Sequence, residues 1–257
     1  MKSPSRTSAS QPKLNTAFKV SGDDSHLRYE PADRGEQPLV RLPSALLRRL
    51  AKAPDLASTT SDVLDDLGWN LAVASDRLGP RLARTHAVAG HVLTIRYLSE
   101  RLTPGATRSG GGPIKMAHNL MFRLARAGDI LVIDASGVDD ASTMGANAAA
   151  AAKRAGLQAA VVDGCIRDVA AIRNLGFPIW SRGVTPRTGK FRIEASSINR
   201  PVACGGVQVH PGDVAVADQT GICFIPLEVA GVVIKRVLEV SPSSAFGRRS
   251  RQASGVG

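Results

Sequence analysis

The stretch Asp163-Gly164-Cys165-Ile166-Arg167-Asp168 carries the densest set of chemically capable side chains in the sequence. It lies between a predicted buried strand and a predicted helix, and open α/β sheets bind ligands at the carboxyl ends of their strands. Gly164 lets the chain turn, while Arg167 and Asp168 place a guanidinium beside a carboxylate where helix amides favour anions. Such a pair can hold a cation and an anionic substrate together. The structural alternative is that Asp168 caps the helix and Arg167 is an exposed neighbour.

A second junction of strand and helix lies at Thr143-Met144-Gly145-Ala146-Asn147-Ala148. Backbone amides that open a helix have no acceptor within it, so those of Gly145, Ala146, Asn147 and Ala148 can bind a carboxylate. The alternative is a helix start built from small residues for close packing. Neither junction decides between these interpretations alone.

Three other features near these junctions have a functional and a structural interpretation. His118 could contact a substrate, although a single histidine on a helix is more often a surface or core residue, and the five histidines show no metal-ligand spacing. Cys165 is typical of a small packing residue rather than a nucleophile. The triple glycine 110–112 resembles a phosphate loop, but no Gly-Lys-Ser/Thr follows, so we predict a flexible connector.

Charged residues in two further loops allow similar alternatives. Asp134, Asp139 and Asp140 follow a predicted strand and could orient water on a metal ion, or could serve only in turns and caps. Arg187 and Lys190 flank a Thr-Gly pair in a basic loop that could face a site from a neighbouring subunit. The ordinary interpretation of that loop is a solvated one.

Apolar and alternating runs predict the elements that position these residues. The predicted strands cover 86–97, 130–134, 159–163 and 178–180, and the predicted helices cover 113–127, 146–154 and 168–174. Their order makes two parallel strand-helix-strand crossovers. Two predicted helices open the domain, one over 43–50 and one over 61–67 with a Ser or Thr cap. Short strands within 201–209 and 213–218 form a β-rich portion, and a last helix over 228–238 ends the domain.

Length and composition agree with one α/β protein. Of 257 residues, 43% are hydrophobic and only 4% aromatic, with 25 glycines, which favours a core of small and branched side chains at close backbone approaches. No window approaches the roughly 18 to 20 apolar residues of a membrane span. The first residues lack the apolar block of a secretory signal, so we do not expect export, and three cysteines lack metal or disulfide spacing. We therefore expect a cytoplasmic protein with no membrane partner.

The net charge of +11 lies largely at the two ends of the chain. Residues 1–19 and 248–251 contain lysines and arginines without any acid. Such termini usually remain solvated. We expect a flexible basic N-terminal extension over 1–41, a catalytic domain over 42–240 and a disordered basic tail over 241–257. Because the domain itself keeps only a modest charge, we do not expect nucleic acid as a partner.

The motifs together resemble those of the RraA-like family, which includes the 4-hydroxy-4-methyl-2-oxoglutarate aldolases. The resemblance runs from about Ser61 to about Leu238. It includes Gly-Asp-x-Leu-Val-x-Asp at 128–134 and Asp-Gly-x-x-Arg-Asp at 163–168, followed by the later segments 202–214 and 217–221. The motifs are specific because several agree in order and spacing.

The resemblance implies a fold and a chemistry. It implies a swivelling β/β/α domain with a C-terminal β-rich portion, assembled as a homotrimer or as a hexamer of two trimers. It further implies that Arg167 contacts the keto oxygen of a 2-oxo acid and that Asp168 anchors Mg²⁺ or Mn²⁺. The amides of Gly145, Ala146, Asn147 and Ala148 would bind the substrate carboxylate. The implied reaction is retro-aldol cleavage to pyruvate, or decarboxylation of oxaloacetate, through a metal-stabilised enolate.

One departure from the family pattern concerns the residue after Gly145. Many aldolases of the family have an acid there, which helps order metal-bound water, whereas this sequence has Ala146. Asn147 cannot replace that acid as a base. In the opposite direction, the non-catalytic regulators that bind a ribonuclease can lack the metal-binding acid, and Asp168 is present. The sequence therefore favours a class II lyase, with a regulator that binds a ribonuclease or another protein as the alternative.

Overall fold

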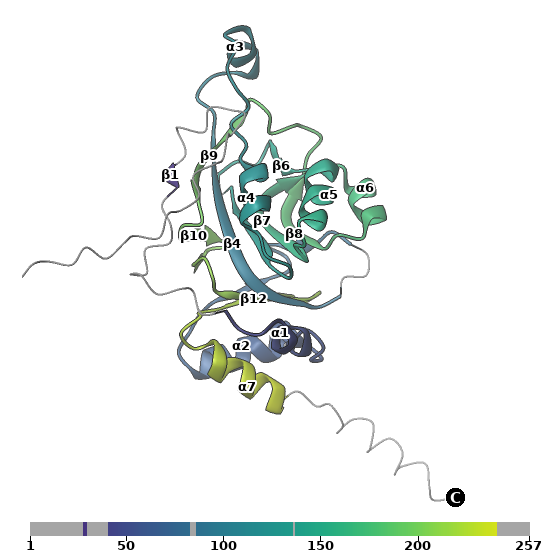
Figure 1. Cartoon of the computed structure of the whole chain (residues 1–257), viewed down its shortest axis with the longest axis vertical. Helices are drawn as coiled ribbons and strands as arrows, with labels where there is room; N and C mark the ends of the chain where they lie inside the picture. The colour runs from purple at the N-terminus through teal and green to yellow at the C-terminus, as the bar shows by residue number, and fades with distance from the viewer. Residues whose placement is uncertain (1–27, 30–40, 83–85, 136, 241–257) are drawn as a thin grey trace, which may run out of the picture.

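The computed structural model describes residues 28–29, 41–82, 86–135 and 137–240. It is a mixed α/β fold, as predicted, with one large mixed sheet and helices packed against it (Figure 1). The helices are α1 Ser44–Leu50, α2 Leu56–Asp66, α3 Pro104–Ser109, α4 His118–Leu124, α5 Ala146–Arg154, α6 Val169–Leu175 and α7 Ala230–Val240. The strands are β1 Arg28–Tyr29, β2 Ala72–Ala74, β3 Gly79–Pro80, β4 Val88–Ser99, β5 Ile130–Asp134, β6 Ser142–Met144, β7 Ala159–Ile166, β8 Ile179–Val184, β9 Ile193–Ile198, β10 Val202–Cys204, β11 Val207–Val209, β12 Val214–Ala217 and β13 Gly221–Ile225.

The long strand β4 connects the two halves of the sheet. Its first residues, 88–91, pair antiparallel with β12, which continues to β13 and β2. Residues 92–96 pair in parallel with β5, and 95–99 pair antiparallel with β9. Beyond β5 the order continues through β7, β8 and β3. The C-terminal strands β12 and β13 thus extend the same sheet that carries the parallel crossovers, whereas β10 and β11 form a separate two-stranded sheet.

The predicted crossovers are present. Strands β5, β7 and β8 are parallel neighbours, and α5 and α6 connect them on one side of the sheet. Alternate residues of β5 and β7 point to opposite faces, and both faces are covered. Leu131 and Ile133 pack in the cluster with α4, α5 and α6, whereas Ile130 and Val132 pack in the cluster with the β10–β11 hairpin. Burial on both faces explains why these strands are continuously apolar in sequence.

A third cluster lies at the other end of the molecule. Helices α1, α2 and α7 gather below β12 and cover β12, β13 and the start of β4 (Figure 1). Within α2, the buried face includes Leu56, Val63 and Leu64, and in α7 it includes Val233 and Ile234. These helices form a base that lies apart from α5 and α6.

Several predicted helix boundaries were wrong. The helix expected over 113–127 covers only α4, because the preceding segment joins the sheet edge: Ala195 N–H donates to the carbonyl of Lys115 at 2.9 Å. Helix α2 starts before residue 61, and Asp55 stands at its N-terminus in a left-handed conformation without a side-chain cap. The triple glycine 110–112 directly follows α3, a helix that was not predicted and that Thr103 caps at its N-terminus.

The strands β2, β3, β6, β9 and β13 were not predicted. The first four are short or contain polar residues, and non-local pairing rather than local pattern makes them strands. β13 was missed although its sequence Gly-Ile-Cys-Phe-Ile is apolar and buried. The segments 1–27, 30–40 and 241–257 lie outside the described residues, so the expected extension and tail stay predictions there. Within the expected extension, β1 pairs in parallel with β9, and Arg41 forms an ion pair with Asp129.

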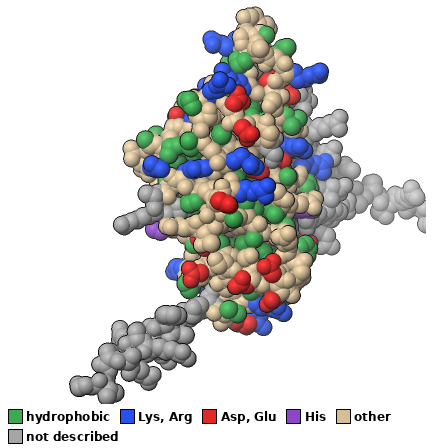
Figure 2. Space-filling model, turned by 180° about the vertical axis from the view of Figure 1, so that it is seen from behind, with side chains coloured by type: hydrophobic (Ala, Val, Ile, Leu, Met, Phe, Trp, Pro, Cys, Tyr) green, Lys and Arg blue, Asp and Glu red, His purple; other side chains and the backbone are tan. Residues whose placement is uncertain are grey.

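The surface charge of the described residues is mixed. On the face that Figure 2 shows, Lys and Arg side chains lie singly or in small groups between acidic, apolar and neutral ones. None of the helices in the described part of the chain has the length and apolar character needed to cross a bilayer.

Candidate functional site

The pairing of β6 with β7 brings the two predicted junctions together. Ser142 lies opposite Cys165 and Met144 opposite Ile166 in a parallel register. The backbone N–H of Arg167 then donates to the carbonyl of Met144 at 3.0 Å. The residues that follow the two strands therefore emerge side by side at one edge of the sheet.

Gly145 is needed at this junction because the opposite segment comes so close. A Cβ atom at position 145 would lie 2.6 Å from Asp168 Oδ2 and 3.1 Å from the Cγ and Nε atoms of Arg167. The absent side chain lets the Arg-Asp pair lie directly against the first turn of α5. Gly145 does allow close packing, as the structural alternative predicts. The groups that pack against it, however, are the charged side chains of Arg167 and Asp168.

Asp168 has an unusual conformation that its side chain explains. Its backbone is left-handed, with φ 60° and ψ 37°, which is uncommon for a non-glycine residue. It occupies the position before α6 but makes no side-chain cap there. Instead, Oδ2 accepts from the backbone N–H of Ala146 at 3.1 Å and lies 3.5 Å from Nε of Arg167. Asp168 therefore connects α6 to α5 rather than capping its own helix.

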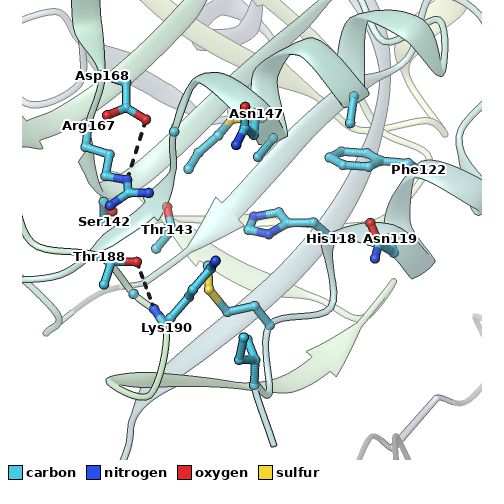
Figure 3. Close-up of a pocket in the computed structure, with 17 residues that line it drawn as sticks. His118, Asn119, Phe122, Ser142, Thr143, Asn147, Arg167, Asp168, Thr188 and Lys190 are labelled. Carbon is cyan, nitrogen blue, oxygen red and sulfur yellow. Dashed lines mark hydrogen bonds and ion pairs between the residues drawn. The ribbon is translucent and has the colours of Figure 1, made fainter. Parts of the chain in front are cut away.

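A cavity of about 300 Å³ opens beside this pair (Figure 3). Its lining includes five of the six predicted site residues: Gly145, Asn147, Ala148, Arg167 and Asp168. The sixth, Ala146, contributes its amide to Asp168. The first hydrogen bond of α5 runs from Ala149 N–H to the carbonyl of Gly145 at 2.9 Å, so the amides of Asn147 and Ala148 precede the helical ladder.

His118 enters the cavity from α4, opposite Arg167 and Asp168 (Figure 3). Its ring is tilted against Tyr97, with centroids 5.7 Å apart, and stacked on Phe122 at 6.0 Å. Burial lowers the pKa of His118 to about 4, and a backbone hydrogen bond with Thr143 offsets only part of this shift. The imidazole is therefore neutral at pH 7.

Lys190 also lines the cavity, together with Thr188 and Gly189. The loop is held beside β6 because Ser142 forms a parallel bridge to Thr188 and its N–H donates to the carbonyl of Arg187 at 3.0 Å. Lys190 is exposed, as expected for a solvated loop, and it also lines the cavity, as the functional interpretation of the loop requires. A two-residue bridge between distant segments leaves no local pattern, so the sequence could not show that Lys190 reaches a cavity of its own chain.

The four acids considered near the strand ends lie outside the cavity lining. Asp140 forms an exposed ion pair with Arg187, and the carbonyl of Asp139 accepts from the Cys165 thiol. Asp134 and Asp163 are buried and accept from backbone amides of the β10–β11 segment. The suggestion that Asp134, Asp139 or Asp140 orients water on a metal receives no support from this arrangement.

The donor set can hold one hard divalent cation, but only through few protein ligands. Asp168 is the sole carboxylate among the residues lining the cavity, and its side chain is 42% exposed. No group of three or more His, Cys, Asp or Glu gathers as metal ligands in the described part of the chain. Mg²⁺ typically binds through one or two carboxylates and completes its shell with water and substrate oxygens. Asp168 fits this pattern.

Comparison with known proteins identifies the family. The family model RraA-like, described as Aldolase/RraA, matches residues 57–224, more than half of the chain. The chain belongs to the RraA-like family. The crystal structure of Streptomyces coelicolor RraAS2, described as an unusual member of the RNase ES inhibitor RraA protein family, is similar with a TM-score of 0.68 and 28% identity over 83% of this chain and 99% of that chain.

RraA-like relatives with curated names match shorter segments. A protein of Halalkalibacterium halodurans named "Putative 4-hydroxy-4-methyl-2-oxoglutarate aldolase" is 42% identical over 102 residues, 40% of this chain and 48% of that protein. A protein of the same name from Deinococcus radiodurans is 34% identical over 96 residues, 37% of this chain and 59% of that protein. The matches thus span about half the length of these relatives.

Proposed function

We propose that this RraA-like protein is a divalent-metal-dependent lyase that acts on a 2-oxo acid. The proposed reactions are retro-aldol cleavage of 4-hydroxy-4-methyl-2-oxoglutarate to pyruvate and decarboxylation of oxaloacetate. The observation that carries the proposal is the contact of Arg167 and Asp168 with Gly145 and the amide of Ala146, at the edge of a cavity large enough for a small dicarboxylate. Relatives named as aldolases support the same reaction class.

Each group in the cavity has a role in this proposal. The amides of Asn147 and Ala148 bind the 2-oxo carboxylate at the start of α5. Arg167 lies beside the keto oxygen, where it stabilises the negative charge that develops as the enolate forms. The amide of Ala146 and the Arg167 guanidinium hold Asp168 in place as the protein ligand of Mg²⁺ or Mn²⁺. When bound, the cation supplies Lewis-acid polarisation of the carbonyl.

Lys190 provides the second positive charge on the cavity lining. Both proposed substrates carry two carboxylates, and the amides of α5 account for only one of them. We assign the distal carboxylate to Lys190, with Thr188 beside it. This assignment makes the cavity selective for dicarboxylic over monocarboxylic oxo acids.

We also propose assembly as a homotrimer or as two stacked trimers. Apolar side chains at the end of β4 and around α3 support it, because Leu98, Leu102 and Ile114 are exposed there and α3 protrudes from the sheet (Figure 1). Size measurement in solution distinguishes a trimer or hexamer from a monomer.

The decisive experiment measures pyruvate release from both substrates by the full chain, with Mg²⁺, with Mn²⁺ and with EDTA. We expect turnover that the chelator abolishes and that Asp168→Ala lowers by at least about 100-fold. Asp140→Ala is the matched control, because Asp140 is an exposed acid whose partner Arg187 lies outside the cavity lining. Wild-type turnover that is indifferent to EDTA or to Asp168→Ala contradicts the metal-dependent proposal.

The alternative is a non-catalytic regulator. An absence of turnover with every 2-oxo acid tested, together with binding of a ribonuclease that Asp168→Ala leaves intact, would establish that alternative instead.

A further inference from the structure

The Nε2 atom of His118 is a buried polar atom without a hydrogen-bond partner in the described part of the chain. The residue is 9% exposed and lines the cavity, and its ring points from α4 toward Thr143 and the interior of the cavity (Figure 3). Leaving a buried polar atom unsatisfied costs about 1 to 3 kcal/mol. An unpartnered nitrogen on the wall of a cavity is therefore placed to meet a polar group of the ligand.

The rest of the lining lacks a neutral base. Arg167 and Lys190 are cations, and Asp168 is already engaged by the Ala146 amide and the guanidinium. The position after Gly145 holds Ala146, which has no titratable side chain. Retro-aldol cleavage nevertheless requires a group that removes the proton of the hydroxyl on C4. Among the residues lining the cavity, His118 offers an unused imidazole nitrogen.

We propose that His118 is the general base of the retro-aldol step, an inference that rests on the proposed lyase function. The Nε2 atom accepts the proton of the C4 hydroxyl, the C4–O bond becomes a carbonyl, and the C3–C4 bond breaks. The electron pair of that bond passes into the enolate of the C1–C3 fragment. The imidazolium then returns its proton to C3. Two molecules of pyruvate leave from one 4-hydroxy-4-methyl-2-oxoglutarate, and His118 is again neutral.

The environment of the ring is consistent with this role. Because burial lowers the pKa of His118, the resting ring is unprotonated and can accept a proton. The carboxylates of a bound substrate stabilise the imidazolium that forms. Packing against Tyr97 and Phe122 fixes the direction of the ring.

The choice of two substrates separates a catalytic from a structural role. Cleavage of the hydroxy acid requires removal of the hydroxyl proton, whereas decarboxylation of oxaloacetate has no such proton. We expect His118→Gln to lower kcat for the hydroxy acid by about 100-fold while changing kcat for oxaloacetate by less than about threefold. His118→Phe, which keeps an aromatic ring against Tyr97 and Phe122, should give the same split if the Gln variant folds poorly. His86→Gln is the control, because His86 is exposed and lies outside the cavity lining.

The outcomes are distinct. Equal losses on both substrates, or no loss on either, overturn the assignment of His118 as the base. A wild-type protein that decarboxylates oxaloacetate but does not cleave the hydroxy acid overturns the role of His118 and leaves a lyase. A wild-type protein that acts on neither substrate overturns the proposed function itself.

Discussion

The site depends on two backbone positions, Gly145 and Asp168, whose geometry tolerates little change. Asp168 holds a left-handed conformation, which costs on the order of 1 kcal/mol for a residue with a side chain. Its bond to the Ala146 amide and its proximity to Arg167 compensate for that strain. Gly145 makes this contact sterically possible. The smallest change at position 145 therefore tests whether the contact matters.

We expect Gly145→Ala to displace the Asp168 carboxylate and lower kcat/KM by at least about tenfold, because the new Cβ would lie 2.6 Å from Oδ2. The free energy of unfolding should fall by about 1 to 3 kcal/mol from the forced shift. Gly231→Ala in α7 is the control, since its Cβ meets nothing within 4 Å. It should stabilise the protein by roughly 0.5 to 1 kcal/mol and leave activity unchanged. Steady-state kinetics and thermal denaturation of both variants measure these effects, and full activity in Gly145→Ala would contradict the close approach.

His118 also predicts a pH dependence of stability. The unfolded chain binds its proton near pH 6.5 and the folded chain only near pH 4, because burial disfavours the charged ring. Between these pH values the unfolded state holds more protons, so stability falls as the pH is lowered from 6.5 to 4. His118 accounts for a loss on the order of 3 kcal/mol over this window.

Urea denaturation at pH 7 and at pH 4.5 measures this loss. His118→Phe should lose markedly less stability than wild type over the same interval. Burial also lowers the pKa of His91, which both proteins retain and which contributes equally to the two curves. Parallel losses in the two proteins would show that His118 is protonated in the folded state above pH 4.5.

The elements show how far the sequence predicts the site. The apolar runs 130–134 and 159–163 predict strands because burial on both faces leaves a local signature, and strand ends then identify Arg167, Asp168 and Gly145 as neighbours. The strand β9 has no such signature: its sequence Ile-Glu-Ala-Ser-Ser-Ile becomes a strand because β4 pairs with it. For the same reason, the sequence names Lys190 only as a residue that could face a site from a neighbouring subunit, because a non-local bridge places its loop beside the cavity of its own chain.

The packing of the β10–β11 hairpin against the sheet gives Asp163 a structural role. The sequence places this acid in the chemical motif, but the structure buries it beneath the β10–β11 hairpin. Its Oδ1 accepts from Nε of Arg182 in β8 at 2.8 Å, and its Oδ2 accepts from the N–H of Gly205 at 2.7 Å. Asp134, directly opposite on β5, accepts from Ala203 N–H at 3.3 Å. The two acids fasten the hairpin to the ends of the parallel strands.

Asp163→Ala should therefore destabilise the protein by about 3 kcal/mol, because it leaves Arg182 and a buried amide without this partner. Asp140→Ala breaks an exposed ion pair, whose side chains are 60% and 68% exposed, and should cost less than about 1 kcal/mol. Urea midpoints of the two variants make the comparison. Similar small losses would mean that the hairpin is held by its apolar contacts alone.

At the scale of the whole molecule, β4 joins the half of the sheet that is covered by α1, α2 and α7 to the half that is covered by α4, α5 and α6. Its residue Ala89 packs with α1, α2 and α7, whereas Leu93 and Ile95 pack in the cluster that includes α4 and α5. A strand that contributes to both clusters cannot lose its pairing in one without disturbing the other. The helical base and the site-bearing sheet should therefore unfold together, as single cooperative domains do.

The two tryptophans report on two different clusters of the core. Trp69 packs against the base cluster, and Trp180 is fully buried in β8, where its indole N–H donates to the carbonyl of Asp218 at 2.7 Å. We expect Trp69→Phe and Trp180→Phe each to show a fluorescence transition that coincides with its own far-UV circular dichroism transition. The Trp180→Phe variant should be less stable because of the lost hydrogen bond and volume, but comparison within each variant removes that difference. If the transition reported by Trp69 preceded loss of secondary structure, the helical base formed by α1, α2 and α7 would be an independently unfolding unit. In that case β4 would not couple it to the site, and substitutions in α2 or α7 would change stability without changing turnover.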